Sequence, residues 1–227
     1  MHGAEYDEMT EAIDEYKDKF ESVAIAEPML GEVGDDATVI NDDKKAVAQA
    51  ITDEACKEAG YDSMEAAAKD GTAFVFMGHG TSHTANVTYD QMQTQMEDLG
   101  FTNAFIGTVE GEPEDTECQA VIAKVKDAGF KKVVLRPLMV VAGDHANNDM
   151  AGDDDDSWKS QFDASGAFDS VDCQIAGLGR IEAVEDLYVE HTKAAIDSLG
   201  TADTAEETTD DTAEAADDSA ETTEEAE

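Results

Sequence analysis

The feature that most constrains this chain is a regular alternation of short apolar runs and helical patterns between residues 72 and 199. Four runs have the length and the β-branched or aromatic content of buried strands. These runs are Ala73–Met77, Ala104–Val109, Lys132–Val141 and Asp172–Ala176. Strands that alternate with helices form a parallel sheet with right-handed crossovers. The sequence therefore predicts an α/β fold, with a parallel sheet of about four strands and flanking helices.

Helical patterns occupy the intervals between these runs. The clearest follows the second run, with Pro113 expected in its first turn and Gly129 beyond its end. Its apolar face consists of Cys118, Val121, Ile122 and Val125. A similar stripe covers Tyr89–Leu99, a helix-forming composition covers Ala46–Glu58, and Ile181–Leu199 predicts a closing helix.

The first sixty residues do not continue the regular alternation. Glu5–Phe20 has a helical pattern, and Val23–Ala26 has the composition of a strand. A helix and one strand make only the end of an α/β layer, because a buried parallel strand needs neighbours on both edges. We therefore expect residues 1–60 to be the remnant of a first α/β domain and residues 61–200 to be a complete second domain, with the boundary between residues 60 and 72.

Acidic side chains dominate the composition. The chain has 55 Asp and Glu against 14 Lys and Arg, a formal net charge of -41. Such a charge opposes nucleic acid phosphates and anionic lipid headgroups, and no apolar run approaches the ~18 residues of a membrane span. We expect no nucleic-acid partner and no membrane association. Residues 201–227 hold 12 of the acids and no Lys or Arg, so they are predicted to be a disordered acidic tail.

The cysteines give no sign of an oxidising compartment. Cys56, Cys118 and Cys173 are odd in number and lack C-x-x-C spacing, which argues against a disulfide framework and against a thiolate zinc site. The first residues have neither the basic nor the apolar segment of a signal peptide. These observations indicate a cytoplasmic protein.

Polar segments rich in glycine and histidine follow three of the predicted strands. His79 follows the first, between Gly78 and Gly80; Glu110 follows the second, and His145 the third. Because ligands gather at the carboxyl ends of parallel strands, one crevice can collect all three side chains. Two imidazoles and a carboxylate suit a borderline divalent metal and leave coordination positions open for transfer or catalysis. The alternatives are a structural turn at His79 and an exposed loop acid at Glu110.

Other polar residues give weaker signals. His83 lies four residues after His79, and we expect it to support the metal ligands or contact the substrate, against the alternative of an ordinary loop histidine. His191 falls on the apolar side of the closing helix, which favours a satisfied core or interface histidine. The acidic run Asp153–Asp156 is expected to be a solvated loop, or to place negative charge at the start of the helix that bears Trp158.

Several segments resemble one family, the anaerobic sirohydrochlorin cobaltochelatases, which are class II tetrapyrrole chelatases. The matching segments occur in the family's order across residues 70–195. They are Met77–Thr81, Gly107–Gly111, Ala142–Ala146, Asn148–Gly152, Asp156–Ser160 and Gly177–Gly179. The resemblance implies a chelatase-like fold of two similar α/β domains that face each other across a cleft.

The resemblance also implies a function. It suggests a lyase that inserts Co²⁺ into sirohydrochlorin, or into its oxidised precursor form, in anaerobic cobalamin biosynthesis. The family's metal ligands would fall on His79, Glu110 and His145, and no organic cofactor is expected. Fe²⁺ or Ni²⁺ as the metal and a homo-oligomer are left open. The alternatives are a non-catalytic metal or haem/tetrapyrrole-binding carrier, or a ferrochelatase-type activity that makes sirohaem or haem.

The chain departs from the family's pattern at its front. The family normally has a complete first domain, whereas this chain begins near a segment, His2–Tyr6, that resembles the family's Gly-x-Glu-Tyr. We therefore expect one wall of the cleft to be incomplete. Since sirohydrochlorin is polycarboxylated, the acidic surface should slow its capture, and basic groups such as Arg136, Lys159 or Arg180 would offset this locally.

Overall fold

A four-stranded parallel sheet forms the centre of the protein. The computed structural model describes residues 1–34, 36 and 40–206 of the 227. The strand order is β2-β1-β3-β4, and every neighbouring pair is parallel. The strands are β1 (Thr72–Gly78), β2 (Ala104–Thr108), β3 (Lys132–Pro137) and β4 (Ser170–Cys173). The predicted fold class and all four strands are confirmed, although β3 ends four residues earlier than expected.

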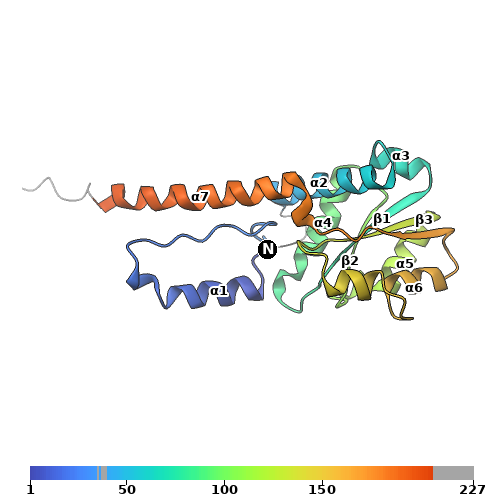
Figure 1. The fold of residues 1–227 in the computed structure, drawn as a ribbon, viewed down its shortest axis with the longest axis horizontal. Helices are drawn as coiled ribbons and strands as arrows, with labels where there is room; N and C mark the ends of the chain where they lie inside the picture. The colour runs from blue at the N-terminus through green and yellow to red at the C-terminus, as the bar shows by residue number, and fades with distance from the viewer. Residues whose placement is uncertain (35, 37–39, 207–227) are drawn as a thin grey trace, which may run out of the picture.

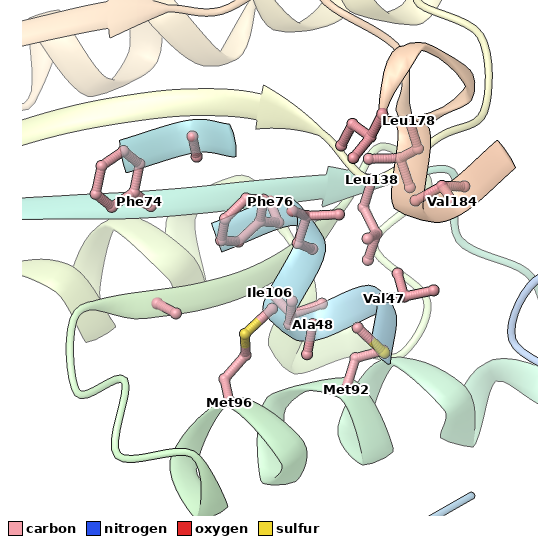
Figure 2. Packing of buried hydrophobic residues seen from close by; sticks show 14 of the residues in the cluster. Val47, Ala48, Phe74, Phe76, Met92, Met96, Ile106, Leu138, Leu178 and Val184 are labelled. Carbon is pink, nitrogen blue, oxygen red and sulfur yellow. The ribbon is translucent and has the colours of Figure 1, made fainter. Parts of the chain in front are cut away.

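Helices cover both faces of the sheet (Figure 1). The α-helices of the described chain are α1 (Ala4–Asp14), which lies apart from the sheet, α2 (Asp42–Ala59), α3 (Met64–Lys69), α4 (Val87–Asp98), α5 (Cys118–Asp127), α6 (Trp158–Ala164) and α7 (Glu182–Glu206). Phe74 and Phe76 of β1 share a buried cluster with side chains of α2, α4 and α7 (Figure 2), whereas Val75 and Met77 pack with side chains of α5 and α6. Alternate residues of a strand point to opposite faces, so β1 is buried on both sides.

The helix before β3 begins later than the sequence predicts. Pro113 does not lie in the first turn of α5 but immediately precedes a short 3₁₀ turn, Glu114–Thr116. The Thr116 hydroxyl donates to the Pro113 carbonyl oxygen at 2.5 Å and lies 2.6 Å from the hydroxyl of Thr108. These bonds hold the segment as a separate turn. At the other end, Gly129 follows α5 with φ +87°, as its predicted role as a cap requires.

The strand expected at Val23–Ala26 is absent from the described part of the chain. These residues pair with no described strand, and the preceding helix α1 ends at Asp14, followed by a 3₁₀ turn at Lys17–Lys19. α1 buries none of its residues. A short apolar run becomes a strand only where it pairs with the edge of a sheet, and this segment pairs with neither β2 nor β4, the edge strands of the central sheet.

Helix α2 belongs to the core of the sheet. Ile51 and Ala55 are fully buried in the cluster that contains Phe74 and Phe76, and Val47 and Ala48 of the same helix lie in this cluster in Figure 2. The helix is capped by the Asn41 side chain, whose Oδ1 accepts a hydrogen bond from the Lys44 amide at 3.0 Å. Helix α2 therefore packs with residues that follow the boundary predicted between residues 60 and 72. Which residues derive from a preceding domain stays a prediction.

Helix α7 is long and projects beyond the sheet (Figure 1). It runs seven residues past Leu199, the end predicted from the sequence, and so takes in residues 201–206 of the expected acidic tail. Extending an existing helix fixes one residue for each hydrogen bond gained, which is easier than starting a new one. Residues 207–227 lie outside the described residues. Within the described range, no helix combines the length and apolarity needed to cross a membrane.

The packing of α2 gives a first testable prediction. We expect Ile51→Ala to lower the free energy of unfolding by about 2–5 kcal/mol, because it leaves a cavity against β1. Lys45→Ala changes an exposed position of the same helix and should stay within about 0.5 kcal/mol of the parent. Urea unfolding of the full chain measures both. Equal, small losses would show that α2 is not part of the core.

Candidate metal centre

Three loops meet at the carboxyl edge of the sheet. His79 is the first residue after β1, Glu110 is the second after β2, and His145 begins a π-helical turn, η4 (His145–Met150), that follows β3. The Glu110 amide donates to the His79 carbonyl oxygen at 2.9 Å, and the Val109 amide donates to the Gly78 carbonyl oxygen at 3.0 Å. These bonds continue the ladder beyond the strands and hold the first two loops side by side.

The structure brings His79 and His145 into contact. Their ring centroids lie 4.8 Å apart, with an interplanar angle of 80°. His79 Nδ1 lies 2.9 Å from the Gly80 carbonyl oxygen, and His145 Nδ1 lies 2.6 Å from Asp149 Oδ2. A carbonyl and a carboxylate only accept, so each Nδ1 carries the hydrogen and each neutral ring keeps its Nε2 lone pair free. Histidine ligands of metals are oriented in this way.

The π-helical turn sets the position of His145. Ala146 and Met150 of the turn are buried and anchor it to the protein. Asn147 Nδ2 donates to the Gly143 carbonyl oxygen at 2.7 Å, closing the start of the turn. Turns of this width occur frequently at functional sites. The sequence predicted a polar loop here and did not predict the turn, because only a single helical turn is involved.

Glycine is required immediately after His79. Gly80 has φ +94°, and a Cβ built on it would lie 2.9 Å from the Cβ of Glu110. The Gly80 amide donates to the hydroxyl oxygen of Tyr89 at 2.9 Å. Burial raises the pKa of Tyr89, so this buried hydroxyl stays neutral. The turn therefore presses the His79 segment against the segment that carries Glu110.

The Glu110 carboxylate does not join the two imidazoles in the structure. The Glu110 residue is exposed, and among the described residues no three His, Cys, Asp or Glu side chains are arranged to hold a metal ion. Of the three predicted ligands, His79 and His145 have their rings in contact. Glu110 is adjacent to His79 only through its backbone. The role of Glu110 as a ligand stays a prediction.

His83 connects the loop after β1 to α1. Its Nδ1 accepts a hydrogen bond from the Ala85 amide at 3.1 Å, at the start of the 3₁₀ turn Thr84–Asn86. Its Nε2 lies 3.4 Å from Asp7 Oδ2 of α1. Both ring nitrogens therefore have protein partners. The predicted part of His83 in substrate binding stays a prediction.

Two other polar residues have structural partners. His191 of α7 places Nδ1 3.0 Å from the Glu27 carbonyl oxygen and Nε2 3.1 Å from Asp43 Oδ1, so the prediction of a satisfied histidine is confirmed. Arg136 is buried in β3 and donates to Glu58 Oε2 at 2.6 Å. Arg136 is therefore not available to hold a substrate carboxylate at the edge of the sheet, contrary to the expectation from the sequence.

The cysteines do not contribute to the centre. All three are free, and burial raises the pKa of Cys56 and of Cys173 to about 11 and that of Cys118 to about 12. The thiolate is the form that binds metals, and it is scarcely populated near neutral pH at these values. The donors at the sheet edge are therefore nitrogen and oxygen.

A parallel sheet with helices on both faces and two imidazoles in contact at its carboxyl edge defines a protein of the α/β class. The model of the family described as Cobalt chelatase (CbiK) matches residues 1–197. The chain belongs to this family, which confirms the resemblance seen in the motifs.

Two curated relatives are similar to part of the chain. The sirohydrochlorin cobaltochelatase of Salmonella typhimurium strain LT2 is 43% identical over 122 residues, which cover 54% of this chain and 44% of that protein. Sirohydrochlorin cobaltochelatase CbiKC of Nitratidesulfovibrio vulgaris strain Hildenborough is 34% identical over 138 residues, 60% of this chain and 46% of that protein. The matched region therefore spans less than half the length of these relatives.

The turn after His79 gives a second prediction. Gly80→Ala should destabilise the fold by about 1–3 kcal/mol through backbone strain, and the contact with Glu110 should add to this and displace His79. Gly129→Ala is the matched control, since Gly129 also has positive φ but nothing within 4 Å of an added Cβ. Thermal unfolding and Co²⁺ titration measure the two effects. If Gly80→Ala and Gly129→Ala were equally destabilised and bound Co²⁺ with equal affinity, the close contact between residue 80 and Glu110 would be contradicted.

Proposed function

We propose that this chain inserts Co²⁺ into sirohydrochlorin, a tetrapyrrole metal chelation of anaerobic cobalamin biosynthesis, in the cytoplasm and without an organic cofactor. The observation that carries the proposal is the contact between His79 and His145, each with its Nδ1 engaged and its Nε2 free. Membership of the cobalt chelatase family and the names of the two curated relatives support it.

In this proposal the metal ion is a substrate, held before transfer. His79 and His145 bind it through Nε2, and Glu110 provides the third donor by rotation about its side-chain bonds. That rotation is feasible because Glu110 is exposed and its amide is fixed 2.9 Å from the His79 carbonyl oxygen. Three protein donors leave a coordination position open to the macrocycle. The same donors accept Fe²⁺ and Ni²⁺, so the donor set alone does not select cobalt.

Insertion also requires a base, because the macrocycle loses two N–H protons as the metal enters. When the ion leaves His145, the Nε2 lone pair becomes free to accept one of these protons, and the Asp149 carboxylate stabilises the imidazolium through Nδ1–H. His79 or Glu110 accepts the second proton in the same way. The same three side chains thus release the metal and take up the protons, and the macrocycle receives Co²⁺ with no change in total charge.

The direct test is anaerobic incubation of the full chain with sirohydrochlorin and Co²⁺, followed by absorbance. We expect catalytic turnover to the cobalt complex. Stoichiometric tetrapyrrole or metal binding without insertion would indicate a carrier instead of an enzyme. If the chain showed no binding and no insertion, both the enzyme and the carrier interpretations would be overturned. Parallel reactions with Fe²⁺ and Ni²⁺ identify the preferred metal.

Two variants separate the base from its supporting carboxylate. His145→Ala should lower the insertion rate about 10²–10⁴-fold, as expected for loss of a general base. Asp149→Asn should lower Co²⁺ affinity or activity about 10–100-fold, because the amide carries no negative charge and its NH₂ group can donate to Nδ1, which favours the wrong tautomer. Asp153→Asn removes an exposed acid of the same loop and should behave as the parent. Full activity in His145→Ala would show that the site assignment is wrong.

A further inference from the structure

A cavity of about 410 Å³ lies beyond the carboxyl ends of β3 and β4. It is lined by Val140, Val141, Ile175, Gly177, Gly179 and Arg180. Val140, Val141 and Ile175 are 40%, 73% and 44% exposed. Large aliphatic side chains with this exposure around a concave surface are typical of a binding site rather than of a folded core.

The floor of the cavity is a close crossing of two backbone segments. The Leu178 amide donates to the Met139 carbonyl oxygen at 2.9 Å, and the Gly179 amide donates to the Val140 carbonyl oxygen at 3.0 Å. A Cβ built on Gly177 would lie 2.4 Å from that Val140 oxygen. Only glycine permits this approach, so the crossing forms a fixed floor without side chains at residues 177 and 179.

The cavity adjoins the turn that carries His145. Ala142 also lines it and precedes His145 by three residues, which can span at most about 10 Å. The Asn147 side chain of the π-helical turn donates to the Ala142 carbonyl oxygen at 3.3 Å. The apolar surface and the imidazole pair are therefore parts of one continuous edge, close enough for a single flat ligand to contact both.

Arg180 supplies the only guanidinium available at this edge. The sequence has two arginines, and Arg136 is buried and paired with Glu58. The Arg180 guanidinium makes no hydrogen bond or ion pair with any residue that the structure describes, although Asp53, Glu54 and Glu182 border a neighbouring cavity that it also lines. A guanidinium left unpaired beside an apolar surface is complementary to an apolar ligand with a peripheral carboxylate.

We propose that this cavity seats one edge of the tetrapyrrole. Val140, Val141 and Ile175 contact the macrocycle, and Arg180 binds one of its peripheral carboxylates, which places the central nitrogens over the imidazole pair. This inference rests on the proposed function, because it takes the polycarboxylated tetrapyrrole as the ligand. It assigns Arg180 to substrate binding and orientation, with no part in metal or proton transfer.

The test is a fluorescence titration of the full chain with metal-free uroporphyrin, a polycarboxylated porphyrin, at low ionic strength. Arg180→Gln should weaken binding about tenfold, which corresponds to about 1.4 kcal/mol, and should raise KM for sirohydrochlorin while leaving kcat unchanged. Arg180→Lys should recover part of the affinity. Lys126→Gln removes one positive charge from an exposed position on α5 and should bind as the parent.

A second variant tests the apolar surface independently. Val141→Asp places a carboxylate at an exposed position and should weaken porphyrin binding at least tenfold, whereas Val141→Leu should retain it. Thermal unfolding by circular dichroism verifies that each variant is folded. If the parent binds porphyrin and inserts Co²⁺ while Arg180→Gln and Val141→Asp match it, the inference is overturned and the proposed function stands. If the parent neither binds nor inserts, both are overturned.

Discussion

The position of every candidate ligand depends on the burial of β1. This strand has parallel neighbours on both edges and helices on both faces, and its residues from Ala73 to Met77 are all apolar and fully buried. The first place where the chain can expose an imidazole is the residue after the strand, where His79 lies. Because β2 and β3 run parallel to β1, their ends deliver Glu110 and His145 to the same edge.

The charge of the protein acts differently on the two substrates of the proposed reaction. A net charge of -41 attracts a divalent cation and repels a polycarboxylated macrocycle at long range. Capture of the macrocycle must therefore depend on short-range contacts. The apolar residues beside Arg180 and the guanidinium itself are groups of that kind, and in the proposed reaction their place next to the His145 turn would join substrate orientation to metal binding.

The sequence predicted the sheet well because strand periodicity and turn chemistry are local properties. The four strands and the meeting of His79 with His145 followed from them. The strand at Val23–Ala26 was wrong because composition does not reveal whether a partner edge exists. The packing of α2 against β1 could not be predicted, because an amphipathic pattern does not say which sheet a helix covers. Arg136 was expected near the substrate, but its burial depends on Glu58, 78 positions away, and no local signal reports such a pair.

The wide turn that begins at His145 makes the length of this loop critical. Asp149 reaches the His145 ring across one turn whose winding differs from that of an α-helix. Each residue of an α-helix advances the chain by about 100° around the axis, and each residue of a wider turn by somewhat less. Removal of a single residue between His145 and Asp149 would therefore carry the carboxylate to a different side of the turn. Substitutions that keep the length leave this geometry intact, whereas insertions and deletions here change the direction in which the imidazole is held.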